Sequence, residues 1–247
     1  MILYLTSSPC VIGADRALLT PKNGFLDHMK ADLRPGANCL YIASSPDDLA
    51  GNRRYSWDMY NAFAEAGMLF REMRILQRDN MHNAAALIQW SNFIILAGGH
   101  VPTQNTFFRE LNLRALLADY AGVIMGISAG TMNCADVVYA QPEMAGESID
   151  PNYKRFVPGL NLTNIQVLPH YQQVKDDLLD GKRLYEDITF EDSCGHNFLA
   201  LPDGSYVCVR SGVTMLHGEA YRLSDRKMRK ICSDGQSVKL IWKDKEI

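Results

Sequence analysis

One serine stands between two glycines directly after an apolar run, in the segment VIMGISAGTM. Glycine lacks a Cβ atom, so Gly126 and Gly130 tolerate the backbone angles and the close approach that a sharp strand-to-helix turn requires. Such a turn exposes Ser128, as in the nucleophile elbow G-x-S-x-G of serine hydrolases. The alternative is a Gly-Ser loop that joins a strand to a helix. The motif makes Ser128 a candidate nucleophile that other residues must support.

A serine hydroxyl needs a base to take its proton, and histidine is the usual one because its pKa lies near neutrality. His170 follows Pro169 at the end of the apolar run IQVL. Ligand sites of open α/β sheets lie outside the carboxyl ends of the strands, so we expect Ser128 and His170 to meet at one sheet edge. The remaining histidines considered are expected on the surface, in turns or in packing: His28, His82, His196 and His217.

Such a pair also needs a carboxylate that orients the imidazole. The sequence offers Glu147 in AGES, Asp192 in FEDSCG and Asp203 in LPDGSYV. Asp203 begins an Asp-Gly pair between two strand-like runs, where a simple hairpin turn is the alternative interpretation. Glu147 stands in a segment that we expect to cover the site as a loop. The alternative interpretation of Glu147 is a carboxylate that water solvates. The residues alone leave the choice of acid open.

Two backbone amides must also face the charge that develops on the substrate oxygen. One is expected from Ala129, directly after the candidate nucleophile. The other is expected from Gly98 or Gly99, which end the apolar run FIILA and allow close approach. A phosphate-binding loop is the alternative, but neither G-x-G-x-x-G nor G-x-x-x-x-G-K-[ST] occurs.

Short apolar runs separated by amphipathic stretches predict the elements that position these residues. The runs ILYL, CLYIA, FREMRIL, FIILAG and VIMGIS indicate parallel strands buried on both faces. Helices are expected at residues 57–66, ended by Gly67, and at residues 106–120, with a Phe and Leu stripe toward the core. After Asp192, β-patterned runs alternate with turns, which predicts late antiparallel strands. The fold class is therefore α/β, and we expect one domain over residues 1–247.

Composition restricts the class of protein. The 247 residues carry a formal net charge of −3 without a basic run, so we expect no nucleic-acid partner. No apolar run approaches the roughly 18 residues of a membrane helix, and MILYLTSS lacks a cationic leader, so we expect a soluble protein without a membrane partner. The six cysteines form no C-x-x-C pair and fit a reducing cytoplasm. Cys134 is expected as a packed thiol rather than a reactive one.

Four motifs occur in order: AGG followed by QNTFF, GISAG after a strand, LPHY, and LPDGSYV. Together they resemble the aspartyl dipeptidase (dipeptidase E) and cyanophycinase family of serine peptidases, over residues 1–223. The resemblance implies a flavodoxin-like, class I glutamine amidotransferase-like three-layer α/β/α sandwich, with serine in place of the amidotransferase cysteine. It also implies that Ser128 is the nucleophile and His170 the base.

The resemblance bears on the acid and the oxyanion hole as well. Asp203 stands at the acid position of the dipeptidase motif L-P-E-G, with Asp in place of Glu. Glu147 stands at an acidic position that the cyanophycinase branch carries after its elbow, and it is the second choice. Gly99 and Ala129 match the oxyanion-hole positions. The segment GGHVPTQN replaces a shorter GGGNT-like loop of the dipeptidases.

Sequence analysis therefore predicts a serine-type peptidase that hydrolyses a small peptide through an acyl-enzyme, without a metal or an organic cofactor. The resemblance implies an acidic N-terminal residue, such as aspartyl, in the substrate. The sequence singles out no arginine to bind it, and Arg109 and Arg155 are the candidates. A carboxylesterase and a non-catalytic binding protein on the same sandwich are the alternatives. The oligomeric state stays open between monomer and homodimer.

Overall fold

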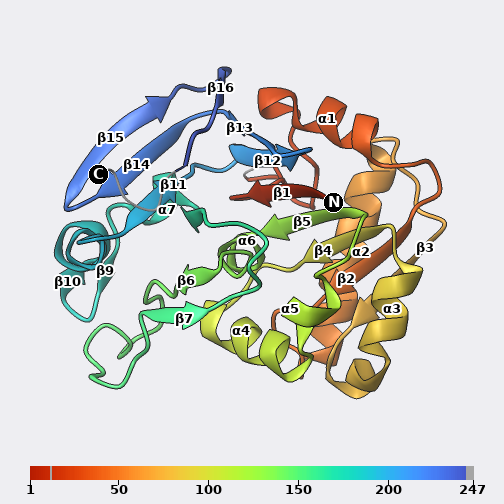
Figure 1. Ribbon diagram of the computed structural model, residues 1–247, viewed down its shortest axis with the longest axis horizontal. Coiled ribbons are helices and arrows are strands. Elements are labelled where there is room, and N and C mark those ends of the chain that lie inside the picture. The colour runs from red at the N-terminus through yellow and green to blue at the C-terminus, as the bar shows by residue number, and fades with distance from the viewer. Residues whose placement is uncertain (12, 243–247) are drawn as a thin grey trace.

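An eight-stranded mixed sheet, here the main sheet, forms the centre of the structure (Figure 1). The computed structural model describes residues 1–11 and 13–242. The strands of the main sheet are β1 (Ile2–Thr6), β2 (Asn38–Ile42), β3 (Glu72–Leu76), β4 (Phe93–Leu96), β5 (Val123–Ile127), β12 (Tyr206–Arg210), β13 (Val213–His217) and β16 (Ser237–Lys239). Their order is β16-β13-β12-β1-β5-β4-β2-β3. Neighbouring strands pair in parallel along β1, β5, β4, β2 and β3. The strands β12, β13 and β16 pair antiparallel, as expected for the late strands. This arrangement confirms the predicted α/β class.

Helices cover both faces of the main sheet. The elements on one face are η1 (Lys22–Gly24), α1 (Phe25–Asp32) and α2 (Leu49–Glu65); those on the other are η2 (Arg78–Asn83), α3 (Ala84–Trp90), α4 (Val101–Glu110) and α5 (Leu113–Leu116). Side chains alternate along a strand, so Tyr4 of β1 packs in the cluster that contains Phe25 of α1. Leu3 and Leu5 pack in the opposite cluster with Phe107 of α4. The three layers follow from this two-sided burial.

Two helices depart from their predicted bounds. The helix expected at residues 57–66 begins eight residues earlier, at Leu49, because the Asp48 side chain accepts a hydrogen bond at 2.9 Å from a backbone N–H of the first turn. It ends just before Gly67, whose φ of 80° suits a residue that follows a helix. The helix expected at residues 106–120 is split into α4 and α5, because Asn112 adopts a left-handed φ of 52° between them.

A second, four-stranded sheet contains the strand that leads to His170. Its strands are β8 (Gln166–Leu168), β11 (Asn197–Ala200), β14 (Ala220–Ser224) and β15 (Lys227–Cys232), in the order β15-β14-β11-β8. The prediction that the strands before Ser128 and His170 share one sheet is therefore wrong. An apolar run shows that a strand is buried, but strand pairing depends on contacts distant in sequence. Asp203 lies in the crossover from β11 to β12, between the two sheets, rather than in a hairpin.

The remaining elements are short, and several lie toward the end of the main sheet to which β5 points (Figure 1). They are α6 (Ala129–Met132), β6 (Val137–Tyr139), β7 (Phe156–Pro158), α7 (Tyr171–Val174), β9 (Leu178–Leu179), β10 (Lys182–Arg183), the π-helix η3 (Leu184–Thr189) and α8 (Phe190–Asp192). β6 pairs with β7 and β9 with β10, each as an antiparallel pair. These segments surround the carboxyl end of β5, where the candidate nucleophile stands.

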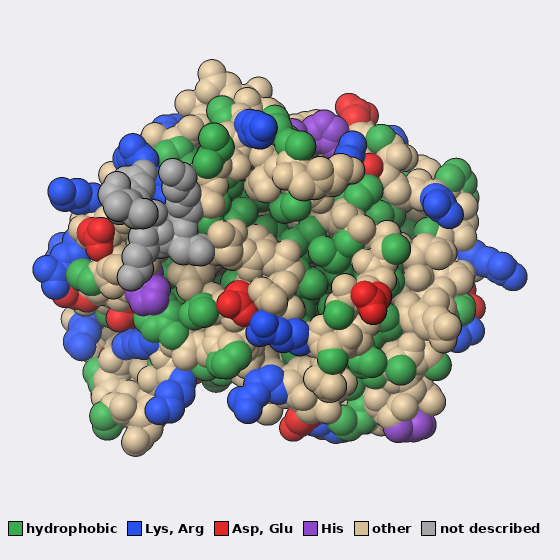
Figure 2. Space-filling model, viewed as in Figure 1, with side chains coloured by type: hydrophobic (Ala, Val, Ile, Leu, Met, Phe, Trp, Pro, Cys, Tyr) green, Lys and Arg blue, Asp and Glu red, His purple; other side chains and the backbone are tan. Residues whose placement is uncertain are grey.

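The surface carries charges of both signs. Basic and acidic side chains are interspersed with apolar ones on the face shown in Figure 2. Within residues 1–11 and 13–242, none of the helices combines the length and the apolar composition needed to cross a bilayer.

Two glycines allow α6 to lie against the main sheet directly after β5. A Cβ atom on Gly126 would lie 2.7 Å from the Cα atom of Thr131, and one on Gly130 would lie 2.2 Å from the carbonyl oxygen of Leu96 in β4. Both distances are too short for non-bonded atoms, so either side chain would push α6 away from the sheet. The close backbone approach expected from the motif is thus present at both glycines.

We expect Gly130→Ala to destabilise the fold by about 3 kcal/mol, because its Cβ atom would overlap the backbone of β4. Alanine is otherwise the better helix former by about 1 kcal/mol, so intrinsic propensity predicts the opposite sign. The matched control is Gly36→Ala, where φ is +68° and nothing lies within 4 Å. That change should cost only about 1 kcal/mol of left-handed strain. Urea unfolding measures both, and equal stabilities of the two variants would contradict this account of Gly130.

Candidate active site

Ser128 occupies a strained turn between β5 and α6. Its φ of 50° and ψ of −113° lie outside the regions that non-glycine residues ordinarily adopt. Its backbone N–H donates to the carbonyl oxygens of Thr6 and Ser7 at 3.2 and 3.1 Å, which ties the turn to the end of β1. Such strain persists where the surrounding structure holds it and is typical of functional turns. This geometry is that of the nucleophile elbow expected from the motif.

His170 brings its imidazole to the Ser128 hydroxyl from the second sheet. His170 follows β8 and also has a left-handed φ, of 57°. Its Nε2 atom lies 2.9 Å from Ser128 Oγ, and its Nδ1 atom lies 2.7 Å from Asp203 Oδ1. A carboxylate can only accept, so Nδ1 carries a proton and donates to Asp203. In the neutral imidazole Nε2 is then the acceptor of the Ser128 hydroxyl proton, as a general base requires.

Asp203 is buried and its carboxylate accepts hydrogen bonds from several groups besides His170. Ser7 Oγ donates to Oδ1 at 2.7 Å. The side-chain amides of Gln172 and Gln173 donate to Oδ2 at 2.8 and 2.6 Å. The backbone N–H of Asp203 in turn donates to Gln172 Oε1 at 2.9 Å. The Asp203 side chain, which is shorter than the Glu of the dipeptidase motif, is therefore held by donors to both carboxylate oxygens. In this orientation it accepts the hydrogen bond from His170 Nδ1.

The surroundings keep this carboxyl ionised. Burial by itself raises the pKa of Asp203, but the hydrogen bonds from His170, Ser7 and Gln172 outweigh it, so the pKa lies below the ordinary value of 3.8. The hydrogen-bond donors stabilise the charged form more than desolvation destabilises it. A negative charge at this position favours the imidazolium that forms when His170 takes a proton.

The other two candidate acids lie away from His170. Glu147 accepts from His100 Nε2 at 2.8 Å and from the backbone N–H groups of Glu143 and Met144 at 2.9 and 3.0 Å. Burial raises the pKa of Glu147, but these amide and imidazole hydrogen bonds outweigh it and lower the pKa overall. Asp192 accepts from Tyr139 Oη at 2.7 Å. The structure thus brings Ser128, His170 and Asp203 together. It places Glu147 on the segment between β6 and β7, which lines the cleft through Glu143 and is here called the covering loop.

The two expected oxyanion donors belong to residues close to Ser128, one next in the chain and one in the cleft wall. Ala129 follows it directly as the first residue of α6. Gly99 lines the same cleft as Ser128 and has a φ of +155°, which residues with a side chain rarely adopt. Ser44 Oγ donates to the carbonyl oxygen of Gly98 at 2.6 Å, which holds the peptide group whose N–H belongs to Gly99. The assignment of Gly99 and Ala129 to an oxyanion hole stays a prediction.

A cleft of about 140 Å³ opens in front of Ser128 and His170. Apolar parts of its wall come from α4, α6, α7 and the start of η3: Val101, Met132, Val174 and Leu184. Its charged side chains are Glu143, from the covering loop, and Asp177, from the segment before β9.

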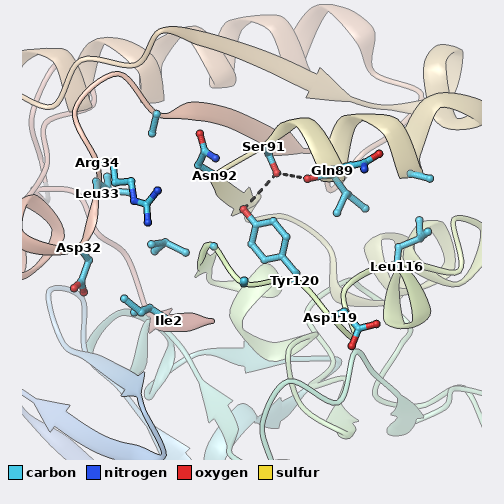
Figure 3. A pocket seen from close by; sticks show the side chains of 16 residues that line it. Ile2, Asp32, Leu33, Arg34, Gln89, Ser91, Asn92, Leu116, Asp119 and Tyr120 are labelled. Carbon is cyan, nitrogen blue, oxygen red and sulfur yellow. Dashed lines mark hydrogen bonds between the residues drawn. The ribbon is translucent and has the colours of Figure 1, made fainter.

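A larger cavity, of about 570 Å³, lies at the opposite end of the main sheet, where β1, β4 and β5 begin (Figure 3). Ser91 and Tyr120 line it and are hydrogen-bonded to each other at 3.3 Å. Asp32, also in its wall, is already paired with Arg210. The residues that line this cavity include no histidine or cysteine. It therefore lacks a histidine base of the kind that the smaller cleft contains.

The structure also shows the surroundings of Cys134 and of two other histidines. Cys134 is fully buried in a core cluster, as expected of a packed thiol, and this burial raises the pKa of its thiol. His217 is buried as expected, but His28 is not simply solvent-facing, because its Nδ1 atom lies 2.5 Å from Tyr206 Oη.

Sequence reasoning missed Ser7, although it follows a predicted strand at the same sheet edge as Ser128. Among the described residues, no group of three or more His, Cys, Asp or Glu is arranged to hold a metal ion.

Comparisons with known proteins give a family match and two similar folds. Residues 26–216 match the model of peptidase family S51. A crystal structure of a peptidase from an acI-B1 Actinobacterium superposes with a TM-score of 0.63 at 16% identity, covering 97% of this chain and 96% of that one. A provisionally named peptidase E protein from Listeria monocytogenes EGD-e superposes with a TM-score of 0.56 at 15% identity, covering 94% and 98%. At these identities the two structures show the fold. No curated protein matches the sequence.

We expect Asp203→Asn to lower kcat by up to about 10⁴-fold, because an amide at this position favours the wrong imidazole tautomer. Glu147→Gln is the matched control, since it also exchanges a hydrogen-bonded, partly buried carboxylate for an amide but lies at His100. It should act mainly on KM, through the covering loop. Steady-state kinetics of both variants test the assignment. A large loss of kcat in Glu147→Gln with Asp203→Asn nearly unchanged would identify Glu147 as the acid.

Removal of the Ser7 hydroxyl should change how stability depends on pH. Because the folded-state pKa of Asp203 is lowered, its ionised form stabilises the fold above pH 3.8, and this contribution is lost as the pH falls through the lowered value. Ser7→Ala removes a donor, so the folded-state pKa of Asp203 rises toward the unfolded value, and the loss of stability on acidification becomes smaller and ends at a higher pH. Urea unfolding between about pH 2 and pH 5 measures this change. Ser8→Ala, next in the chain, should leave the profile unchanged, whereas identical profiles for Ser7→Ala and wild type would contradict the role of Ser7.

Proposed function

The chain belongs to peptidase family S51, and on that premise we propose that it hydrolyses small peptides, dipeptides among them, through a Ser128–His170–Asp203 triad. The proposal rests on two successive hydrogen bonds. One joins Ser128 Oγ to His170 Nε2 at 2.9 Å, and the other joins His170 Nδ1 to Asp203 Oδ1 at 2.7 Å. Nucleophile, base and orienting acid are thus within reach of one another without rearrangement.

In the proposed mechanism, Ser128 Oγ attacks the substrate carbonyl while His170 Nε2 takes its proton. The negative charge that forms on the carbonyl oxygen is stabilised by the N–H groups of Gly99 and Ala129. Asp203 accepts the hydrogen bond from the Nδ1–H group throughout and stabilises the imidazolium without becoming protonated. His170 then gives the Nε2 proton to the leaving amine, and the C–N bond breaks to leave an acyl ester on Ser128.

The second half of the reaction uses the same groups. His170 takes a proton from water, which attacks the acyl ester, and the same backbone N–H groups stabilise the second tetrahedral intermediate. Return of the proton to Ser128 Oγ releases the carboxylic acid product. The cleft volume of about 140 Å³ supports a small acyl residue rather than a folded protein substrate.

Substrate preference is a separate question from mechanism. An acidic first residue, implied by the resemblance to the dipeptidases, stays a prediction. Arg109 and Arg155, the two candidates to bind it, are not among the residues that line the cleft. The apolar walls at Val101, Met132 and Leu184 also suit the acyl pocket of a carboxylesterase. Hydrolysis rates of dipeptides and of short-chain esters, compared on one preparation, decide between these two activities.

We expect Ser128→Ala to abolish hydrolysis, by up to about 10⁶-fold in kcat, and to abolish labelling by a fluorophosphonate probe, because the acyl-accepting oxygen is removed. Ser211→Ala, in the turn between β12 and β13, is the control and should label as the wild type does. Unfolding midpoints show whether the fold is intact. Retention of more than about a tenth of the wild-type activity in Ser128→Ala, with peptides and esters, would overturn the mechanism.

A further inference from the structure

The motif QNTFF contains two side-chain amides, Gln104 and Asn105, that the proposed mechanism does not use. Both lie on α4 and are buried, with exposed fractions of 0% and 5%. Asn133, which directly follows α6, is fully buried as well. A buried amide destabilises a fold unless its donors and its acceptor are paired, so the partners of these three side chains show what they hold in place.

Gln104 joins the segment that follows β4 to the helix that follows Ser128. Its Nε2 atom donates to the carbonyl oxygen of Ala97 at 2.7 Å, and its Oε1 atom accepts from Asn133 Nδ2 at 3.0 Å. The carbonyl oxygen of Ala97 can only accept, so the NH2 end of the Gln104 amide faces it and the oxygen end is left for Asn133. The side chain at this position must therefore both donate and accept.

Two further amide hydrogen bonds hold the end of α6 against α4. Asn133 Nδ2 also donates to the carbonyl oxygen of Val101 at 3.3 Å, and Asn133 Oδ1 accepts from Asn105 Nδ2 at 2.9 Å. Asn105 Nδ2 in turn donates to the carbonyl oxygen of Pro158 at 3.0 Å. The end of α6 is thus tied to the first turn of α4 through buried polar groups.

Two side chains hold the backbone just before Gly99. The carbonyl oxygen of Ala97 accepts from Gln104, and the next carbonyl oxygen, that of Gly98, accepts from Ser44 Oγ at 2.6 Å. Glycine has the widest choice of backbone angles, so the sequence of this segment by itself leaves the direction of the Gly99 N–H free. Hydrogen bonds to two successive carbonyl groups restrict it.

The two expected oxyanion donors therefore share one buried connection. Gly99 follows the carbonyl groups that Gln104 and Ser44 hold. Ala129 begins α6, and the residue after this helix, Asn133, is bonded to the same Gln104 amide. Both N–H groups must point at one oxygen atom, and a displacement of about 1 Å in such a position can lower a rate about 10²-fold.

From this arrangement we propose that Gln104 and Ser44 are positioning residues of the oxyanion hole, which hold the N–H of Gly99 in place relative to that of Ala129. The proposal rests on the peptidase function proposed above and gives these two side chains a role in that reaction. The described residues that line the cleft include neither of them, so both act through the backbone rather than on the substrate.

The test measures how tightly the enzyme binds a molecule that places a negative oxygen atom in this hole. The probe is the aminoaldehyde with the skeleton of the first residue of the best dipeptide substrate, and its reference is the corresponding aminoalcohol. Ser128 Oγ adds to the aldehyde carbon, the hydroxyl proton passes to His170, and the former carbonyl oxygen becomes negatively charged, whereas the alcohol forms no bond. We expect the wild type to bind the aldehyde at least about 10²-fold more tightly than the alcohol.

Gln104→Met keeps the length of the side chain and removes both of its hydrogen bonds. We expect kcat to fall by about 10²-fold with little change in KM, because the interaction that is lost forms only in the transition state. The Ki of the aldehyde should rise by a similar factor, and the Ki of the alcohol should stay the same. Ser44→Ala removes a single donor and should change kcat and the aldehyde Ki in the same directions by about tenfold. This milder variant decides the proposal should Gln104→Met not fold.

Gln77→Met is the matched control. Gln77 is also a buried glutamine, 6% exposed, and its Oε1 atom accepts from Asn52 Nδ2 at 3.1 Å, but this partner belongs to α2 rather than to α6. Its unfolding midpoint should fall as that of Gln104→Met does, while the ratio of the two inhibition constants keeps the wild-type value. A ratio that is unchanged in Gln104→Met and Ser44→Ala, or reduced equally in Gln77→Met, would show that these side chains only stabilise the fold.

The wild-type measurements separate this proposal from the peptidase proposal. Hydrolysis by the wild type, together with an unchanged ratio of inhibition constants in both variants, contradicts the positioning roles and leaves the peptidase function intact. Absence of hydrolysis for every dipeptide contradicts the peptidase function itself, and the positioning roles with it.

Discussion

The hydroxyl of Ser7 joins the three segments on which the candidate site depends. It accepts the backbone N–H of His170 at 2.7 Å and donates to the Asp203 carboxylate at 2.7 Å. The carbonyl oxygen of the same residue accepts the N–H of Ser128 at 3.1 Å. Ser7 is fully buried, so loss of these partners would leave polar groups unsatisfied away from water. One residue at the end of β1 thus holds the backbone of the candidate base and nucleophile and the side chain of the candidate acid.

The site lies where the carboxyl ends of strands from two sheets meet. In the main sheet, β1 and β5 are parallel neighbours, followed by Ser7 and Ser128. In the second sheet, β8 and β11 are parallel neighbours, and the chain after them reaches His170 and Asp203. Parallel pairing delivers the residues that follow neighbouring strands to the same edge, and here it operates once in each sheet. The close packing of α6 then places the two pairs against each other.

Three carboxylates near the cleft differ because their partners differ. Asp203 is buried among donors, which lower its pKa, and Glu147 is stabilised by two backbone N–H groups and His100. Glu143 has a raised pKa because desolvation and the charge of Glu147 exceed the stabilisation from His100, the Val101 backbone N–H and His170. The first two carboxylates have their charge balanced within the protein. The Glu143 side chain lines the cleft and is 47% exposed, so water also solvates its charge.

The sequence by itself indicated the fold class, the parallel strands and most of the residues that meet at the candidate site. Local apolar periodicity predicted the parallel strands, and two glycines around Ser128 indicated the turn, because these features depend on a few adjacent residues. It did not determine that β8 belongs to a second sheet, that Asp203 rather than Glu147 lies at His170, or that Ser7 and Gln173 hold that acid. Those outcomes depend on pairings between residues up to 196 positions apart, as for Ser7 and Asp203. Only the packing of the complete chain decides them, because no local pattern specifies which strand edge or carboxylate a distant segment will meet.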